Sequence, residues 1–239
     1  MEGKILERFK MQKLRAFTLA EIIITMGIVG VIAALTVPGL MSDYQNKTMA
    51  TKVRKTVNEI ETTIDQYITA EGKTKFSQTK VMTESQTLDD FVKENFKVVK
   101  SCGDAKTCKK DCTDGDEACA KEVETCKKNI AAAGCFANDS YLNITKGEGT
   151  PFKCVGSSYV LADSSAICLD FRKTASSYIV VFLDVNGPEP PNISGRDMFR
   201  FIIKNNGTIN PGEKADCLGS NVGAGCLDLL QAHNWVMDY

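Results

Sequence analysis

The stretch FTLAEIIITMGIVGVIAALTVPGLM, from Phe17 to Met41, decides how the rest of this chain is organised. It is an almost unbroken apolar run in which Glu21 is the only charged residue. A helix of about 25 residues, rising roughly 1.5 Å per residue, is long enough to cross a hydrocarbon layer about 30 Å thick. The stretch therefore predicts a membrane-spanning helix. Because a charge in such a helix is costly, Glu21 is expected to have a partner.

The residues in front of this run, MEGKILERFKMQKLRA at positions 1–16, form a basic leader in which lysine and arginine outnumber glutamate. Basic flanks stay on the cytoplasmic side of a membrane, so the chain is expected to enter the bilayer with its C-terminal part outside. A secretory signal has a shorter apolar core followed by a small-residue cleavage site. No A-x-A site follows this run, so we expect the apolar segment to stay attached to the protein.

The junction KLRA-FTLAEIIITMGIVGVIAALTVPGL resembles the N-terminal cleavage and methylation motif of type IV pilins and type II secretion pseudopilins. In that family a prepilin peptidase cuts before the aromatic residue and methylates the new N-terminus. The resemblance implies cleavage between Ala16 and Phe17, methylation of the Phe17 amine, and a role for Glu21 in assembly. Gly30 and Pro38 correspond to a glycine and a proline that let the helix loosen when subunits assemble. Ala16 stands where the family most often has glycine.

The resemblance also implies a location, a function and partners. The protein would be a single-pass protein of the bacterial inner (plasma) membrane with its C-terminal domain outside the cytoplasm. It would serve as a structural subunit of a type II secretion pseudopilus, a type IV pilus or a DNA-uptake pilus. Its partners would be the prepilin peptidase, other pilin-like subunits and an inner-membrane assembly platform. The net charge of −1 suggests no nucleic-acid surface, so nucleic acid is expected as a partner only in a DNA-uptake pilus.

The alternative is a binding protein or enzyme held outside the cytoplasm by a plain signal anchor, with Glu21 at the headgroups. No G-x-S-x-G, H-E-x-x-H or Walker sequence is present, and the only histidine is His233. Acid–base catalysis would therefore have to depend on carboxylates alone. The sequence favours a structural protein without enzymatic activity.

All ten cysteines follow the apolar run. An even number of cysteines in a segment placed outside the cytoplasm predicts disulfide bonds. A zinc site is disfavoured, because the chain has no C-x-x-C and a single histidine. Spacing leaves the connectivity open, with the near pair Cys217 and Cys226 as one natural candidate. The residues expected in disulfides are Cys102, Cys108, Cys112, Cys119, Cys126, Cys135, Cys154, Cys168, Cys217 and Cys226.

The remaining pattern predicts an α+β fold with a cysteine-rich insertion. The resemblance implies that this fold is pilin-like, with a long N-terminal membrane-spanning spine helix packed on a small antiparallel sheet. Apolar residues recur three and four apart from Val53 to Ile68, which predicts an amphipathic half of the spine that ends near Gly72. The expected parts are a leader (1–16), a transmembrane half of the spine (17–41), an amphipathic half (42–72), a helical and cysteine-rich region (73–156), and a sheet with C-terminal loops (157–239).

Within these parts, residues 73–86 are expected to form a polar loop and residues 87–100 a second helix capped by Thr87. About four antiparallel strands are expected after residue 157, with a hairpin turn at Asn205–Gly207. The runs with strand character are 159–161, 167–171, 178–183, 199–203 and 208–209.

The sequence DVNGPEPPNISGRD at 184–197 is dense in oxygen ligands and turn formers. It resembles a D-x-N-G…P-N…G-R-D loop seen near the C-terminus of pilin-like ectodomains, and some major pseudopilins hold calcium in a loop at a similar place. The candidate calcium ligands are Asp184, Asn186, Asn192 and Asp197. The alternative is a turn built from Asx and proline chemistry, with Arg196 paired to a carboxylate.

Overall fold

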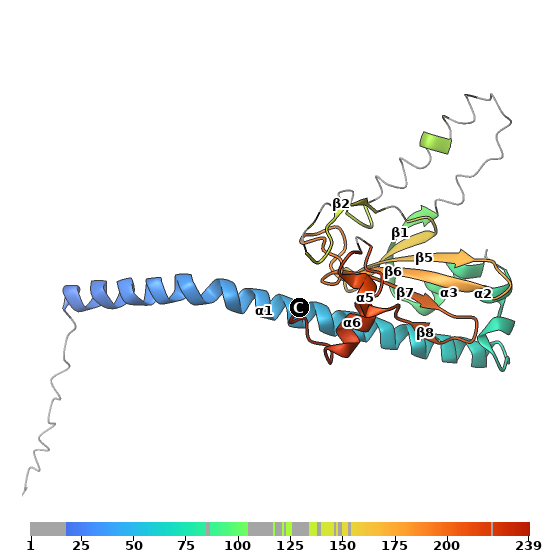
Figure 1. The fold of residues 1–239 in the computed structure, drawn as a ribbon, viewed down its shortest axis with the longest axis horizontal. Coiled ribbons are helices and arrows are strands. Elements are labelled where there is room, and N and C mark those ends of the chain that lie inside the picture. Colours follow the sequence, from blue (N-terminus) through green and yellow to red (C-terminus); the bar gives the residue numbers. More distant parts are fainter. Residues whose placement is uncertain are drawn as a thin grey trace, which may run out of the picture. The chain divides into compact units, whose positions relative to one another are not determined.

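The computed structural model describes residues 18–84, 87–104, 117, 121, 123–125, 134–137, 140–145, 147, 150–152, 154–220 and 222–239. The chain divides into two compact units, Met1–Tyr44 and Gln45–Tyr239 (Figure 1). Several expected features lie outside the described residues: the leader 1–16, the expected cleavage junction Ala16–Phe17, and Cys108, Cys112, Cys119 and Cys126.

The first helix, α1, spans Leu19–Ala70 and is 52 residues long. Pro38 lies inside it. At its end Gly72 has a left-handed φ of 63°. The Gly72 N–H donates to the Thr69 carbonyl and the Lys73 N–H donates to the Ile68 carbonyl, which is a Schellman motif. The stop signal predicted at Gly72 is therefore confirmed.

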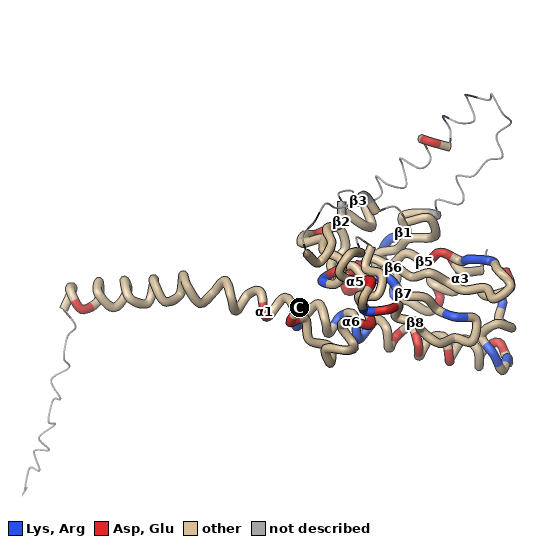
Figure 2. The backbone as a smooth tube through the Cα atoms, in the orientation of Figure 1, with Lys and Arg blue, Asp and Glu red and all other residues tan. Residues whose placement is uncertain are grey.

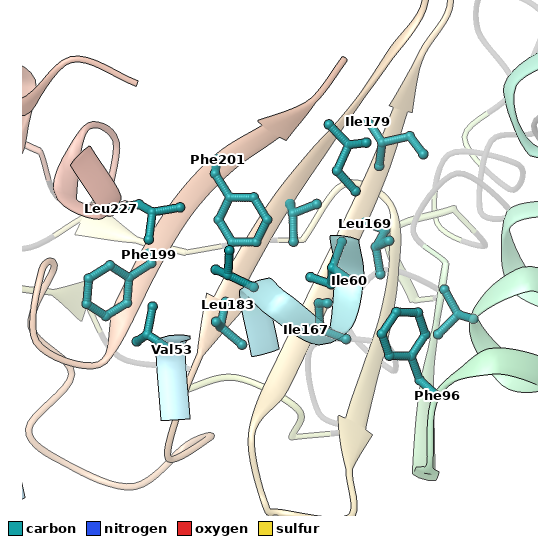
Figure 3. Packing of buried hydrophobic residues seen from close by; sticks show 14 of the residues in the cluster. Val53, Ile60, Phe96, Ile167, Leu169, Ile179, Leu183, Phe199, Phe201 and Leu227 are labelled. Carbon is teal, nitrogen blue, oxygen red and sulfur yellow. The ribbon is translucent and has the colours of Figure 1, made fainter. Parts of the chain in front are cut away.

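In the unit that begins at Gln45, one face of α1 is buried against the sheet (Figure 3). Its contact residues follow the predicted three- and four-residue spacing and are Ala50, Val53, Val57, Ile60 and Ile64. Facing side chains include Ile167 of strand β5 (Ala166–Arg172), Leu183 of strand β6 (Tyr178–Asp184) and Phe201 of strand β7 (Met198–Ile203). Burying each large apolar side chain contributes about 1.5–3 kcal/mol, so this face holds the helix on the sheet.

The sheet has six strands in the order β1-β4-β5-β6-β7-β8, and every pairing is antiparallel. From β4 to β8 it is a meander of sequential neighbours, and β1 adds to the edge beside β4. The strands are β1 (Val98–Asp104), β4 (Ser157–Leu161), β5 (Ala166–Arg172), β6 (Tyr178–Asp184), β7 (Met198–Ile203) and β8 (Ile209–Asn210). The α+β class is thus observed, with more strands than expected.

The second predicted helix is shorter than expected. Helix α3 spans Thr87–Asn95, and the chain then enters β1. Val99, expected on the apolar face of a helix reaching residue 100, is 71% exposed. Thr87 is the first helical residue, and its hydroxyl donates to the Glu84 carbonyl rather than capping the helix. Pairing with β4 satisfies the backbone after Phe96, which explains why the strand replaces the last helical turn.

Residues 73–86 also differ from the expected polar loop. They contain a 3-10 turn, η1 (Phe76–Gln78), and a short helix, α2 (Lys80–Thr83). Phe76 and Val81 are fully buried in the same core as α1. The Asn205–Gly207 turn is present as predicted. Gly207 lies against α1, where a Cβ added to it would be 3.0 Å from the side chain of Ile64.

A smaller core covers the opposite face of the sheet. Strands β2 (Ser140–Tyr141) and β3 (Thr150–Pro151) pair with each other there. The rings of Phe136 and Phe152 lie 4.9 Å apart, and Phe152 lies 4.9 Å from Phe182 of β6. In β5, residues 166 and 168 face this core while 167 and 169 face α1, as alternation along a strand requires.

Three disulfides are present among the described residues: Cys102–Cys135, Cys154–Cys168 and Cys217–Cys226. The first two attach Cys135 and Cys154, which lie in or against the smaller core, to strands β1 and β5 of the sheet. The third, the near pair suggested by spacing, joins helix α5 (Lys214–Cys217) to helix α6 (Cys226–Ala232). Disulfide formation, predicted for all ten cysteines, is therefore observed for these six.

Replacing Ile60 by alanine is expected to destabilise the unit 45–239 by about 2–5 kcal/mol, because its side chain is 2% exposed and faces the sheet. Urea unfolding of that unit measures the change. Gln66→Ala, on the exposed side of the same helix, is the matched control and should change stability by less than about 0.5 kcal/mol. Equal effects at the two positions would contradict the packing described for α1.

Candidate functional site

The first part of α1 carries an apolar surface that none of the described residues covers. Large apolar side chains between Leu19 and Met41 are exposed, from 38% at Ile22 to 78% at Leu19. Among the described residues α1 is the one helix long and apolar enough to cross a membrane, judged by length and composition. Soluble monomers rarely expose apolar patches of this extent, so this segment needs lipid or other helices around it.

Glu21 has a defined local role at the start of this helix. Its Oε2 accepts hydrogen bonds from the Thr18 amide at 2.8 Å and the Thr18 hydroxyl at 3.0 Å. The Glu21 amide in turn donates to Thr18 Oγ1 at 3.2 Å. This reciprocal pair is a capping box, which satisfies donors that the first turn leaves free. The T-x-x-E spacing before an apolar run is a sequence signal for this box, although Thr18 was not among the predicted site residues.

Gly30 and Pro38, the two other residues with an expected assembly role, both lie inside α1. A Cβ added at Gly30 would meet nothing within 4 Å. No contact within the described chain therefore requires glycine at this position. Pro38 has no backbone N–H, so α1 lacks one helical hydrogen bond at this position and is less stable there.

The second site is the loop between β6 and β7, where the candidate calcium ligands lie. The Asp184 carboxylate, fully buried at the end of β6, accepts from the Tyr141 hydroxyl at 2.5 Å and the Asn186 amide at 3.2 Å. The Asp197 carboxylate, also fully buried, accepts from the amides of Asn192 at 2.6 Å and Ile193 at 2.7 Å. Each carboxylate therefore fixes one end of the loop.

Burial raises the pKa of both carboxylates, and the charge of Asp197 adds to the effect at Asp184. Burial raises the pKa of Asp197 to about 6, although backbone donors oppose the shift. Burial, reinforced by the negative charge of Asp197, raises the pKa of Asp184 well above its usual range. Two acids that repel each other in a buried loop are a common arrangement at cation sites and at structural turns alike.

The glycine and asparagine residues of the 184–197 loop form its turns. Gly187 and Gly195 have left-handed φ values of 68° and 81°, and Asn192 has φ 52°. The Asn186 side-chain amide donates to the carbonyls of Glu189 and Pro190 at 2.5 and 2.9 Å. These contacts are the Asx and proline chemistry of the structural-turn interpretation.

The loop is fastened to α1 and to the C-terminal segment. Arg196 donates to Asn46 Oδ1 and to the main-chain oxygen of Tyr239, each at 2.9 Å. Lys52 of α1 donates to the Val185 carbonyl at 3.0 Å. The structural-turn interpretation paired Arg196 with a carboxylate. Among the described residues its partners are the Asn46 amide oxygen and the main-chain oxygen of Tyr239, which its planar fork of donors suits.

The four candidate ligands match calcium in chemistry but are largely engaged by the protein. Hard oxygen donors are what calcium requires, and two such atoms, Asn186 Oδ1 and Asn192 Oδ1, are buried without a hydrogen-bond partner among the described residues. Within the same part of the chain, no group of three or more acidic, histidine or cysteine side chains is placed to hold a metal. If calcium binds, the two carboxylates and these two amide oxygens are its ligands.

The structure thus brings the loop residues together in one place, whereas Glu21, Gly30 and Pro38 lie along the other unit of the chain. No family model, curated protein or solved structure matches this chain. The residues that sequence reasoning did not single out are Thr18, Tyr141, Asn46 and Lys52.

The raised pKa values predict how the loop responds to pH. An acid whose pKa is raised on folding favours the folded state less as pH rises, so Asp197 should lower the melting temperature between about pH 4 and pH 6. In Asp197→Asn this part of the pH dependence should disappear. Thermal melting of the unit 45–239 in chelator, from pH 4 to pH 8, measures it. A wild-type curve with the same slope as the variant would contradict the buried acid pair.

Calcium, if bound, should offset the loss of stability that the two buried, ionised carboxylates cause at neutral pH, because the cation stabilises their charged form. Millimolar calcium should then raise the melting temperature at pH 7 by mass action, and less at pH 5, where protons compete for the ligands. Asp184→Ala should abolish the rise, and Glu189→Ala, at an exposed position of the same loop, should keep it. No effect of calcium on the wild type leaves the structural turn as the correct interpretation.

Proposed function

We propose that this protein is a pilin-like structural subunit of a type IV pilus or type II secretion pseudopilus, cleaved before Phe17 and methylated there. The subunit sits in the bacterial inner membrane through residues 17–41, with the disulfide-bonded domain outside the cytoplasm. It has no catalytic role. Its partners are the prepilin peptidase, other pilin-like subunits and the inner-membrane assembly platform.

The observation that carries this proposal is one helix with two kinds of surface. From Ala50 to Ile64 an apolar face is buried on the sheet, whereas from Leu19 to Met41 apolar side chains are exposed all round. A simple membrane anchor needs only the exposed apolar segment. A helix that continues from an apolar segment into a domain core, preceded by the KLRA-FTLAE junction, is what a subunit assembled through its spine requires.

The capping box gives Glu21 a place in this mechanism. Cleavage before Phe17 leaves an amine on the residue that precedes Thr18, and the Glu21 carboxylate already binds the Thr18 amide. The carboxylate is therefore near the new positive charge of its own subunit. In an assembly an axial shift between helices brings the amine of one subunit beside the carboxylate of the next. Leaving either charge unpaired in an apolar interior is costly, so the pairing sets the shift.

The plain-anchor alternative makes a different prediction about the N-terminus of the protein isolated from its native membrane. The proposal expects N-terminal mass spectrometry to find a methylated Phe17, and an intact Met1 would favour the anchor. Ala16→Leu should block the cut, because the peptidase requires a small residue before the aromatic. Ala16→Gly, which restores the residue most often found in the family, should be processed at least as well as the wild type.

Variants at Glu21 separate its two roles. Glu21→Gln keeps a side-chain oxygen for the capping box but loses the charge, whereas Glu21→Ala loses both. Both should insert and be cleaved, and both should fail to enter filaments or support the machine, while Glu21→Asp should be partly defective. Filament yield and N-terminal processing are measured side by side. If Glu21→Gln assembles like the wild type and Glu21→Ala does not, capping alone matters and the charge-pairing mechanism is wrong.

A further inference from the structure

The three disulfides among the described residues differ in how far solvent reaches their cysteines. In one of them Cys168 is 0% exposed, whereas its partner Cys154 is partly exposed. Both cysteines of the other two disulfides are at most 5% exposed, and these are Cys102, Cys135, Cys217 and Cys226. Among these six residues, Cys154 is therefore the one that a thiol from outside the protein can approach.

Access of this kind decides which disulfide exchanges with an external thiol. Exchange begins when a thiolate attacks one sulfur, and the other sulfur leaves. The leaving sulfur would be buried in all three disulfides, so it does not distinguish them. Attack at Cys154, with Cys168 as the leaving group, is the exchange that the structure favours. Val155, 45% exposed beside Cys154, offers an apolar contact to the attacking protein.

The Cys154–Cys168 disulfide closes one end of a cover over the second face of the sheet. The cover is the set of described residues from 135 to 154, which includes β2 and β3. Phe152, two residues before Cys154, is 7% exposed, and its ring lies 4.9 Å from that of Phe182 in β6. Strands β2 and β3 contain no Lys, Arg, Asp or Glu (Figure 2), so ring packing and disulfides hold the cover rather than ion pairs of these strands.

The cover in turn supports the loop between β6 and β7. The Tyr141 hydroxyl of β2 donates to the buried Asp184 carboxylate at 2.5 Å. The next residue, Leu142, donates its N–H to the Asn192 carbonyl at 2.9 Å. Because β2 pairs with β3, which lies just before Cys154 in the chain, contiguous contacts run from the disulfide to this loop.

We propose that Cys154 is the site at which a dithiol oxidoreductase outside the cytoplasm exchanges the disulfide to Cys168, and that this exchange opens the cover. Opening separates the Tyr141 hydroxyl from Asp184. The other end of the cover stays joined to β1 through the disulfide at Cys102, so the opening is local and reversible. The inference goes beyond the proposed function and does not depend on it, because a plain membrane anchor would place the same disulfide outside the cytoplasm.

The exchange is a two-electron transfer in two steps. A thiolate of the partner attacks Cys154 Sγ and forms a mixed disulfide, while the electron pair of the broken bond goes to Cys168 Sγ, which takes up a proton. The partner's second thiolate then attacks the partner's own sulfur in the mixed disulfide, and Cys154 leaves and is protonated. The partner is oxidised and the protein disulfide is reduced. Closing is the reverse sequence, so the redox state of the partner determines whether the cover is open.

The order of reduction tests the choice of disulfide. The oxidised full chain in detergent micelles is treated with increasing dithiothreitol, new thiols are alkylated, and mass spectrometry of peptides locates them. Cys154 and Cys168 should be alkylated together, at least about tenfold faster than the cysteines of the other two described disulfides, because their bond opens without unfolding of the domain. Simultaneous reduction of all three, or earlier reduction of either of the others, overturns the inference.

A trapping experiment identifies the sulfur that is attacked. The probe is thioredoxin whose second active-site cysteine is replaced by serine, which stops the reaction at the mixed disulfide. The mixed disulfide should be found at Cys154. Its location at Cys168, or its absence from both residues, overturns the assignment of Cys154 as the exchange site.

The variant C154S/C168S tests whether this disulfide holds the cover closed. Hydrogen exchange at the amides of Phe152 and Leu142 should rise by about tenfold or more, whereas exchange at Ile60 of α1 should stay as in the wild type. The matched control C217S/C226S removes the disulfide between α5 and α6 and should leave exchange at Phe152 unchanged.

An equal rise at Phe152 in the control, or no rise in C154S/C168S, contradicts the opening of the cover. If C154S/C168S loses protection at Ile60 as well, the variant is unfolded, and the wild type reduced at this one disulfide provides the same comparison. Loss of protection at Ile60 in that sample overturns the inference, because reduction then unfolds the domain instead of opening the cover.

Discussion

The burial of one face of α1 against the sheet is the constraint on which the rest of the molecule depends. Val53, Ile60 and Ile64 occupy the middle of the sheet, opposite side chains of β5, β6 and β7. Once this face is buried, the remaining faces of α1 must find other environments. Its outer side is exposed and carries charged residues such as Arg54 and Glu61, and no described residue covers its N-terminal half. One helix therefore has a face buried in the domain, an exposed polar face and an exposed apolar segment.

The parts that sequence could predict are those governed by local pattern. The apolar run, the amphipathic spacing and the Gly72 stop predicted α1, and β-branched runs predicted β4 to β8. Strand β1 was not predicted because Val99 continues the helical spacing of α3, and only the pairing with β4 shows that the helix has ended. Phe76 and Val81 were read as loop because their burial depends on a distant hairpin.

The candidate sites also contain a part that local sequence predicts and a part that depends on contacts between distant residues. The sequence could identify the four oxygen-bearing residues of the 184–197 loop, since they lie close together in the chain. It could not identify Tyr141, Lys52 or Asn46 as their supports, because each comes from a separate element brought near by folding. The capping box is the opposite case. Thr18 and Glu21 are three residues apart, so their T-x-x-E spacing is a local signal that the sequence alone contains.

The Cys102–Cys135 disulfide has a consequence for how this protein can change. It joins the end of β1 to the cover of the sheet and brings the two ends of the intervening segment to a Cα separation of 6.0 Å. A segment between these two residues therefore starts and ends at neighbouring points that a covalent bond joins. The entropy of closing such a segment grows only slowly with its length, so added residues are expected to cost the sheet little stability. The domain thereby has a natural port for grafting, where a foreign epitope or binding module with closely spaced ends can be carried on each copy of the chain.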